Sequence, residues 1–223
     1  TKFYITGGIG AAAGHEGFGP PYELPNLTAY NETCASIGEV FWNSRMFLLH
    51  GDSKYYDVLE RVLYNGLVSG VSLSGDHFFY PNPLESEGQH SRSEWFGCAC
   101  CPSNVCRFIP SVPGYMYALQ KEKLYINLFI GSKAHFDLEG HEIEVIQKTN
   151  YPWEGKIEMI LNPSVSRNLD LAVRIPGWAM NQPVPGDLYM FRPMQDIGFT
   201  LTVNGKDVPY VMDKGYAVIT GKW

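Results

Sequence analysis

Residues 124–130 read Leu-Tyr-Ile-Asn-Leu-Phe-Ile, and at this point the hydrophobic pattern of the chain changes. Leu124, Ile126, Leu128 and Ile130 alternate with the residues between them, which is the period of a β-strand with one buried face. The same period of two recurs downstream in short segments at 143–145, 157–161, 169–175 and 199–203. Several short strands at this spacing predict an antiparallel β-sandwich in the second half of the chain.

Two signals near the C-terminus extend this prediction. Asn204-Gly205 follows the segment 199–203 and is a strong signal for a β-hairpin. Residues 215–220 have the pattern of one more strand, which ends close to the last residue. Residue 1 is Thr rather than Met. We therefore expect the chain to be a piece of a longer protein, with the sandwich truncated.

Upstream of residue 124 the apolar residues follow the period of an α-helix. Thr28 is the expected cap of a first helix, and His50-Gly51-Asp52 is its expected end. The apolar positions inside it have helical spacing: Tyr30, Cys34, Ile37, Phe41 and Leu48. A second helix is expected from about Ser53, so that the two would form an antiparallel pair.

A third helix is expected from about Ser103, with Leu119 as its last apolar position. Pro110 and Pro113 fall inside this helical pattern and should kink or break it. Before it, the stretch from about residue 70 to 102 is expected to be an irregular loop. Loops of that length are usually functional.

The change of period divides the chain into a helical domain at residues 1–120 and a β-sandwich domain at 121–223, an α+β multidomain organisation. The chain has 223 residues, of which 45% are apolar and 18% charged, so it can bury a core. Its formal net charge is -6 and it has no cluster of Lys and Arg, which argues against nucleic acid as a partner. No apolar stretch is long enough to span a bilayer, so we expect no membrane partner.

The cysteines point to metal or thiol chemistry rather than to disulfides. Five are present, and four of them lie between Cys98 and Cys106. A disulfide framework would spread its cysteines along the chain, and neighbours such as Cys100 and Cys101 rarely pair with each other. Reduced thiols favour a cytoplasmic location, with the periplasm as the alternative.

A zinc site could be built from Glu32 and Cys34 together with Cys98, Cys100 and Cys101. Thiolate and carboxylate ligands suit zinc, and four of them complete a tetrahedral site. Residues two apart point in different directions in mid-helix, so Glu32 and Cys34 could converge only at a helix end. The alternative is that Cys34 is a buried core thiol and the loop cysteines are incidental.

Glu16 is a candidate general acid/base. It lies in the glycine-rich segment 14–19, within the irregular residues 1–28, and an acid in a mobile loop suits proton transfer. It could equally be an ordinary loop residue. His15 is of interest only through its neighbour Glu16.

Three segments together resemble glycoside hydrolase family 127, whose best-known members are β-L-arabinofuranosidases. They are Tyr22-Glu23-Leu24-Pro25-Asn26, then Tyr30-Asn31-Glu32-Thr33-Cys34-Ala35-Ser36-Ile37-Gly38, and Phe96-Gly97-Cys98-Ala99-Cys100-Cys101-Pro102-Ser103-Asn104. Residues 171–179 resemble a strand of the β-sandwich that follows the catalytic domain of this family. The resemblance implies that residues 1–120 are the C-terminal part of an (α/α)6 toroid.

The resemblance also implies a mechanism. Glu32, Cys34, Cys100 and Cys101 would hold a zinc ion, which keeps thiols deprotonated at neutral pH. Cys100 would attack the anomeric carbon as the nucleophile. Glu16 would protonate the leaving oxygen and then activate water, so that the configuration is retained.

Substrate contacts follow from the same resemblance. Tyr80 matches a family tyrosine near the sugar, Cys98 is close to the site without being a ligand, and His15 neighbours the acid/base. The family's sugar-contacting histidines have no counterpart here, so the isolated chain should hydrolyse poorly.

Two alternatives stay open at this point. One is a related glycosidase that acts on another plant-polysaccharide sugar. The other is a non-catalytic sandwich that binds carbohydrate beside a structural zinc. The expected partner is a carbohydrate in every case, and a homo-oligomer is left open.

Overall fold

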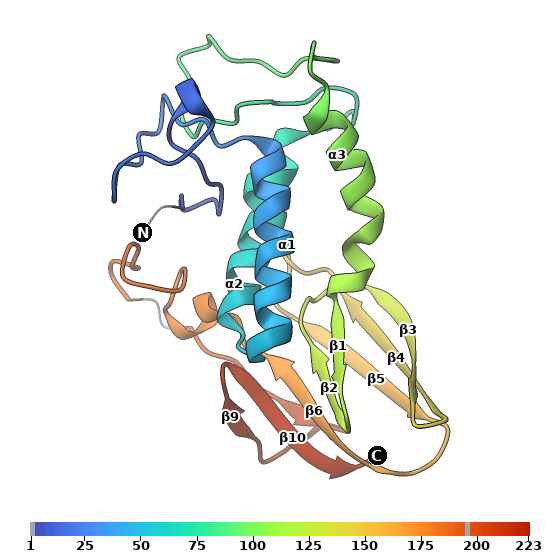
Figure 1. Cartoon of the computed structure of the whole chain (residues 1–223). Helices are drawn as coiled ribbons and strands as arrows, with labels where there is room; N and C mark the ends of the chain where they lie inside the picture. Colours follow the sequence, from blue (N-terminus) through green and yellow to red (C-terminus); the bar gives the residue numbers. More distant parts are fainter. Residues whose placement is uncertain (1–2, 195–196) are drawn as a thin grey trace.

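The structure, a computed structural model, describes residues 3–194 and 197–223 and places helices and sheets at different ends of the molecule (Figure 1). Three α-helices lie side by side: α1 (Thr33–His50), α2 (Lys54–Arg61) and α3 (Cys100–Phe108). The β-strands lie beyond one end of these helices, and irregular segments lie at the other end. Among the described residues, no helix is both long enough and apolar enough to cross a membrane.

The first helix begins later than the sequence predicts. Thr28 is not its cap, because α1 starts at Thr33. Asn31 has a φ of 44°, a left-handed conformation through which an α-helix cannot continue, so the residues before Thr33 are excluded from the helix. The predicted end is confirmed: Gly51 takes a φ of 61° and closes the helix after His50.

The second helix begins where expected and then changes its winding. Ser53 occupies the N-cap position of α2. The helix continues as the π-helix η2 (Val62–Leu67) and ends in the 3-10 turn η3 (Val68–Gly70). The two packed helices α1 and α2 supply much of one hydrophobic core.

The third helix begins at Cys100, three residues before the expected start at Ser103. Pro102 is tolerated there because the N–H groups of a first turn have no partner to lose. The predicted break is confirmed, since the 3-10 helix η4 (Ile109–Tyr115) contains both prolines. The prediction that the helix reaches Leu119 is wrong, because the prolines end the helical winding and Leu119 lies in a strand.

Ten strands are described in the second half of the chain. In order they are β1 (Tyr117–Gln120), β2 (Lys123–Ile126), β3 (Ser132–Leu138), β4 (His141–Thr149), β5 (Ile157–Pro163), β6 (Asn168–Arg174), β7 (Thr202–Val203), β8 (Lys206–Asp207), β9 (Val211–Asp213) and β10 (Tyr216–Lys222). They form a five-stranded sheet in the order β1-β2-β6-β10-β9, a three-stranded sheet in the order β3-β4-β5, and the hairpin β7–β8.

The prediction that the sheets are wholly antiparallel is wrong. Strand β2 pairs with β6 in parallel, with Leu124 opposite Leu171. After β2 the chain forms the entire three-stranded sheet before it returns as β6. A long crossover of this kind allows two neighbouring strands to run in the same direction.

The C-terminal hairpin is confirmed, but its strands are short. Asn204 and Gly205 have φ of 53° and 74°, the positive values that a two-residue hairpin turn requires. Of the strand predicted at 199–203, only Thr202–Val203 is in β7.

The central strands of the five-stranded sheet are buried on both faces. Along β2, Leu124 and Ile126 join a hydrophobic cluster that includes Ile143 of the three-stranded sheet. Tyr125 lies between them and faces the other way, and its ring centroid is 5.5 Å from that of Phe47 in α1. The strand period of two therefore builds two cores, one between the sheets and one under the helices.

A buried ion-pair network fixes α2 to β6. The guanidinium of Arg174 contacts the carboxylates of Asp57, at 2.7 Å from Nη1 to Oδ1, and of Glu60. The Arg174 Nε also donates to the backbone oxygen of Asn127 at 2.7 Å. The helical and β parts are thus joined by polar contacts as well as by the apolar core.

Candidate functional site

Two pairs of side chains, from two motifs that are far apart in the sequence, lie close together in the structure. The ligand atoms of Glu32, Cys34, Cys100 and Cys101 all lie within 4.8 Å of one another. The Cys100 thiol donates to Glu32 Oε1 at 3.4 Å, and the Cys101 thiol donates to the same oxygen at 3.6 Å. The two sulfurs of the second motif are 3.9 Å apart.

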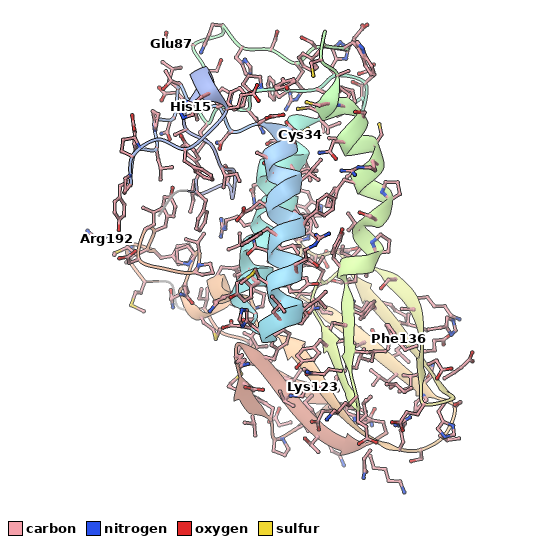
Figure 2. All side chains as sticks on the ribbon, viewed as in Figure 1. His15, Cys34, Glu87, Lys123, Phe136 and Arg192 are labelled. Atoms are coloured by element: carbon pink, nitrogen blue, oxygen red, sulfur yellow. The ribbon has the colours of Figure 1, made fainter. Side chains whose placement is uncertain are left out.

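Two helix N-termini bring these residues together. Glu32 is the N-cap residue of α1 and Cys34 lies in its first turn, while Cys100 and Cys101 are the first two residues of α3. The two helices lie side by side, and Figure 2 shows Cys34 at the end of α1 that is remote from the sheets. The convergence at a helix end that the sequence required is therefore present.

The loop that leads to the cysteines is tied to the start of α1. The N–H of Thr33 donates to the backbone oxygen of Tyr80 at 3.1 Å, and its hydroxyl donates to that of Phe79 at 2.8 Å. This places the Tyr80 side chain at the site, where its interaction with the Cys100 thiol raises the pKa of Tyr80. The Tyr80 ring also packs edge-on against Phe96, at a centroid distance of 5.5 Å.

Glu16 is linked to the site by a hydrogen bond from a tyrosine. Its carboxylate is exposed and is not one of the clustered ligand atoms. Tyr30 donates its hydroxyl hydrogen to Glu16 Oε1 at 2.9 Å. The Tyr30 ring lies 6.4 Å from that of Tyr80, so Glu16 and Cys100 are connected by two neighbouring aromatic side chains.

Two predicted contact residues lie at the surface. His15 is exposed, and its Nε2 is 3.5 Å from the backbone oxygen of Phe18 in the same loop. Cys98 is exposed and has no atom in the cluster; Cys106, farther along α3, is exposed as well. The structure therefore brings together the four predicted ligands and Tyr80, and leaves His15 and Cys98 outside.

The thiols of the cluster differ in acidity. The Cys101 thiol hydrogen-bonds to Cys34 and lowers the pKa of Cys34 to about 7. Burial raises the pKa of Cys100 to about 11, and the hydrogen bond to Cys34 together with burial raises the pKa of Cys101 further. In the metal-free site the Cys34 thiol therefore ionises more readily than the thiols of Cys100 and Cys101.

Comparison with known proteins identifies the family. The family model of the GH127 catalytic domain, named for β-L-arabinofuranosidase, matches residues 1–114. The model of the GH127 middle domain matches residues 123–223. The chain belongs to glycoside hydrolase family 127. The resemblance that the three sequence motifs indicate is therefore confirmed.

Relatives in family 127 match almost the whole chain. The non-reducing end β-L-arabinofuranosidase of Bifidobacterium longum subsp. longum is 33% identical over 98% of this chain and 33% of its own length. A solved GH127 β-arabinofuranosidase matches with a TM-score of 0.96 and 53% identity, over 100% of this chain and 35% of its own. A GH127 β-L-arabinofuranosidase from Geobacillus stearothermophilus T6 matches with a TM-score of 0.88 and 40% identity, over 100% and 34%. The chain thus has the mixed helical and sheet fold of these enzymes and spans about a third of their length.

The donor set of this family 127 chain fits a zinc ion. Zinc bonds of about 2.1 Å to oxygen and 2.3 Å to sulfur place tetrahedral ligand atoms about 3.6–3.8 Å apart. The Glu32 contacts of 3.4 and 3.6 Å and the sulfur–sulfur distance of 3.9 Å are close to these values. Three sulfurs and one carboxylate are also the ligand types that zinc accepts in proteins.

Sequence reasoning missed two residues of this site. Tyr30 was assigned to the core face of a helix, although its hydroxyl holds Glu16. Asn104 interacts with the Cys34 thiol and helps to lower its pKa. Its position four residues after Cys100 on the same helix was a usable signal, because such residues share a helix face.

Proposed function

We propose that the protein to which this chain belongs is a retaining glycoside hydrolase that releases terminal β-linked L-arabinofuranose. The observation that carries this proposal is the convergence of Glu32, Cys34, Cys100 and Cys101, with their ligand atoms within 4.8 Å. Membership of family 127 and the names of the relatives support the sugar. Zinc is the proposed cofactor, because the ligand types and spacings of the site suit it.

Cys100 is the proposed nucleophile. Bound zinc would stabilise the thiolate form of its cysteine ligands at neutral pH. The Cys100 sulfur attacks the anomeric carbon while the bond from that carbon to the leaving oxygen breaks, and Glu16 gives its proton to that oxygen. Glu16 then takes a proton from water, the water oxygen attacks the same carbon, and the carbon–sulfur bond breaks. Two inversions at one carbon retain its configuration.

Tyr80, Cys98 and His15 are the proposed sugar contacts. Tyr80 interacts with the Cys100 thiol, so it would lie near the carbon that Cys100 attacks. Cys98 and His15 are exposed, so a substrate could reach them. The carbohydrate would therefore approach from the end of the molecule that is remote from the sheets.

We further propose that residues 1–120 belong to an (α/α)6 toroid and residues 121–223 form a β-sandwich domain. Trp42, Leu48 and Leu49 on α1 are exposed, which suits a helix that packs against further helices. The two sheets share one hydrophobic core, which suits a sandwich. The free cysteines suit a cytoplasmic location.

The zinc content of the purified full-length protein, with and without Cys100→Ser, is the first test. We expect about one zinc per site in the wild type, a lower content in Cys100→Ser, and wild-type content in the matched variant Cys106→Ser. Cys106 is an exposed thiol on the same helix and lies outside the cluster.

Activity separates the enzyme from a structural zinc site. Cys100→Ser should abolish release of L-arabinose, while Cys106→Ser should retain it. Wild-type activity in Cys100→Ser would remove the nucleophile assignment. A well-folded wild-type protein without zinc would remove the metal assignment.

A further inference from the structure

The carboxylate of Glu16 lies on an exposed turn that does little to fix it. Glu16 follows the 3-10 turn η1 (Ala13–His15), none of whose residues is buried, and has a left-handed φ of 52°. A glutamate side chain on such a turn has several accessible rotamers, whereas proton transfer needs one defined position. A contact from outside the turn is therefore needed to orient it.

Tyr30 supplies that contact from a well-anchored position. Its hydroxyl donates to Glu16 Oε1 at 2.9 Å, and the residue is only 7% exposed. Its backbone oxygen accepts from the N–H of Asn82 at 2.9 Å, and the N–H of Asn31 donates to the oxygen of Gly10 at 2.8 Å. The phenol is therefore a fixed donor.

The same residue also lies next to the cysteine site. Tyr30 precedes the ligand Glu32 by two residues, and its ring lies 6.4 Å from that of Tyr80. Tyr80 in turn lies close enough to Cys100 for the two side chains to shift each other's pKa. Tyr30 thus connects the Glu16 turn to the residues around the nucleophile.

We propose that Tyr30 is the positioning residue that orients Glu16 for proton transfer, an inference that rests on the function proposed above. Because the phenol donates to Oε1, Oε2 is left as the oxygen that would carry the carboxyl proton and give it to the substrate. In the first step this proton passes to the glycosidic oxygen as the carbon–oxygen bond breaks and the carbon–sulfur bond to Cys100 forms. In the second step Oε2 takes a proton from the attacking water as the carbon–sulfur bond breaks.

The test compares two leaving groups in the full-length protein carrying Tyr30→Phe. One substrate is 4-nitrophenyl β-L-arabinofuranoside, whose nitrophenolate departs without a proton. The other is a β-L-arabinofuranosyl disaccharide, whose leaving oxygen needs one. Oriented general acids contribute about 10²–10⁴-fold, so kcat/KM for the disaccharide should fall about 10- to 100-fold. For the aryl substrate it should change by less than about threefold.

Tyr4→Phe is the matched control. Tyr4 is a buried tyrosine in the same N-terminal segment, and its hydroxyl donates to the backbone oxygen of Pro25 at 3.1 Å. It loses a hydroxyl bond of the same kind without touching Glu16. We expect kcat/KM to stay within about twofold for both substrates, since a neutral hydrogen bond contributes little.

A double-mutant cycle with Glu16→Gln tests whether Tyr30 acts through Glu16. Tyr30→Phe should have no further effect in the Glu16→Gln background, and additive losses would overturn the proposal. Equal losses on both substrates, or a Tyr30→Phe protein that behaves like Tyr4→Phe, would overturn it too. If Glu16→Gln lowers kcat/KM equally for the disaccharide and the aryl substrate, the proposed acid/base function of Glu16 fails. If Glu16→Gln lowers kcat/KM more for the disaccharide but Tyr30→Phe does not, only the proposed role of Tyr30 fails. An unchanged melting temperature and zinc content establish that the variants are folded.

Discussion

Replacing Arg174 with methionine should destabilise the protein strongly. Arg174 is fully buried, and the side chains of its partners Asp57 and Glu60 are 11% and 7% exposed. Methionine keeps much of the apolar volume but removes the positive charge, so two carboxylates are left close together and away from water. The substitution therefore tests whether this network, rather than apolar packing alone, joins α2 to β6.

The magnitude follows from the burial of all three charges. Removing one partner of a buried ion pair costs about 3–5 kcal/mol, because the remaining charge is desolvated without compensation. The lost bond from Arg174 Nε to the oxygen of Asn127, 2.7 Å long, adds about 1 kcal/mol. The matched control is Lys148→Met, whose pair with Glu158 is 3.4 Å long with side chains 60% and 51% exposed. There we expect a loss below about 1 kcal/mol.

The pH dependence gives a second check on the same variant. Burial already raises the pKa of Asp57 with Arg174 beside it, and removal of Arg174 should raise that pKa further. An acid whose folded pKa exceeds its unfolded value destabilises the fold above the unfolded pKa, and the penalty is relieved as pH falls through the folded pKa. The loss in Arg174→Met should therefore shrink between pH 7 and pH 5.

Urea unfolding followed by tryptophan fluorescence at both pH values measures these differences. A loss in Arg174→Met no larger than that in Lys148→Met would refute the argument from buried charge. A loss that grows towards pH 5 would refute the assignment of the penalty to stranded carboxylates.

Three further predictions follow from the fold and the site. Gly215→Ala places a Cβ 1.8 Å from Ser53 Oγ, at a backbone φ of +79°. Gly140→Ala is the matched control, because its φ is +83° and no atom lies within 4 Å of the added Cβ. Gly215→Ala should therefore lower the free energy of unfolding by at least about 2 kcal/mol more than Gly140→Ala. Thr33→Val loses the bond to the loop before the cysteines and should speed proteolysis of that loop without changing zinc content, as limited trypsin digestion would measure. Zinc binding at pH 8 should release about two protons, because the raised pKa values of Cys100 and Cys101 favour the protonated thiols in the absence of metal. Calorimetry in buffers of different ionisation enthalpy measures this number, and release of no protons would contradict the prediction.

The convergence of the four clustered side chains could be predicted because each pair is local in the sequence. Glu32 and Cys34 are two residues apart, and Cys100 and Cys101 are adjacent, so the fold has only to bring two segments together. Residues two apart point in different directions in mid-helix and can converge only at a helix end, so the spacing alone predicts a site at a helix end. Family resemblance then supplied the roles.

Features that depend on backbone conformation or on distant pairing could not be predicted. Helical spacing assigned Tyr30 to the helix core, but Asn31 adopts a φ of 44° that no spacing pattern reveals. Strand β3 was missed because Ser132 and Ala134 make its inward face weakly apolar. The parallel pairing of β2 with β6 depends on a crossover across a whole sheet, and alternation along one strand carries no information about its partner's direction.

The electrostatics of the cluster explain why two helix N-termini meet there. With every ligand ionised, Glu32, Cys34, Cys100 and Cys101 would carry four negative charges within 4.8 Å, an arrangement that strong repulsion opposes. The positive ends of the α1 and α3 dipoles offset part of that repulsion. Burial, and for Cys101 first the hydrogen bond to Cys34, also oppose ionisation by raising the pKa values of Cys100 and Cys101, whereas the pKa of Cys34 is lowered. Full ionisation of the thiols therefore needs a cation at the centre, and the same cation that orders the site would make Cys100 available as a thiolate.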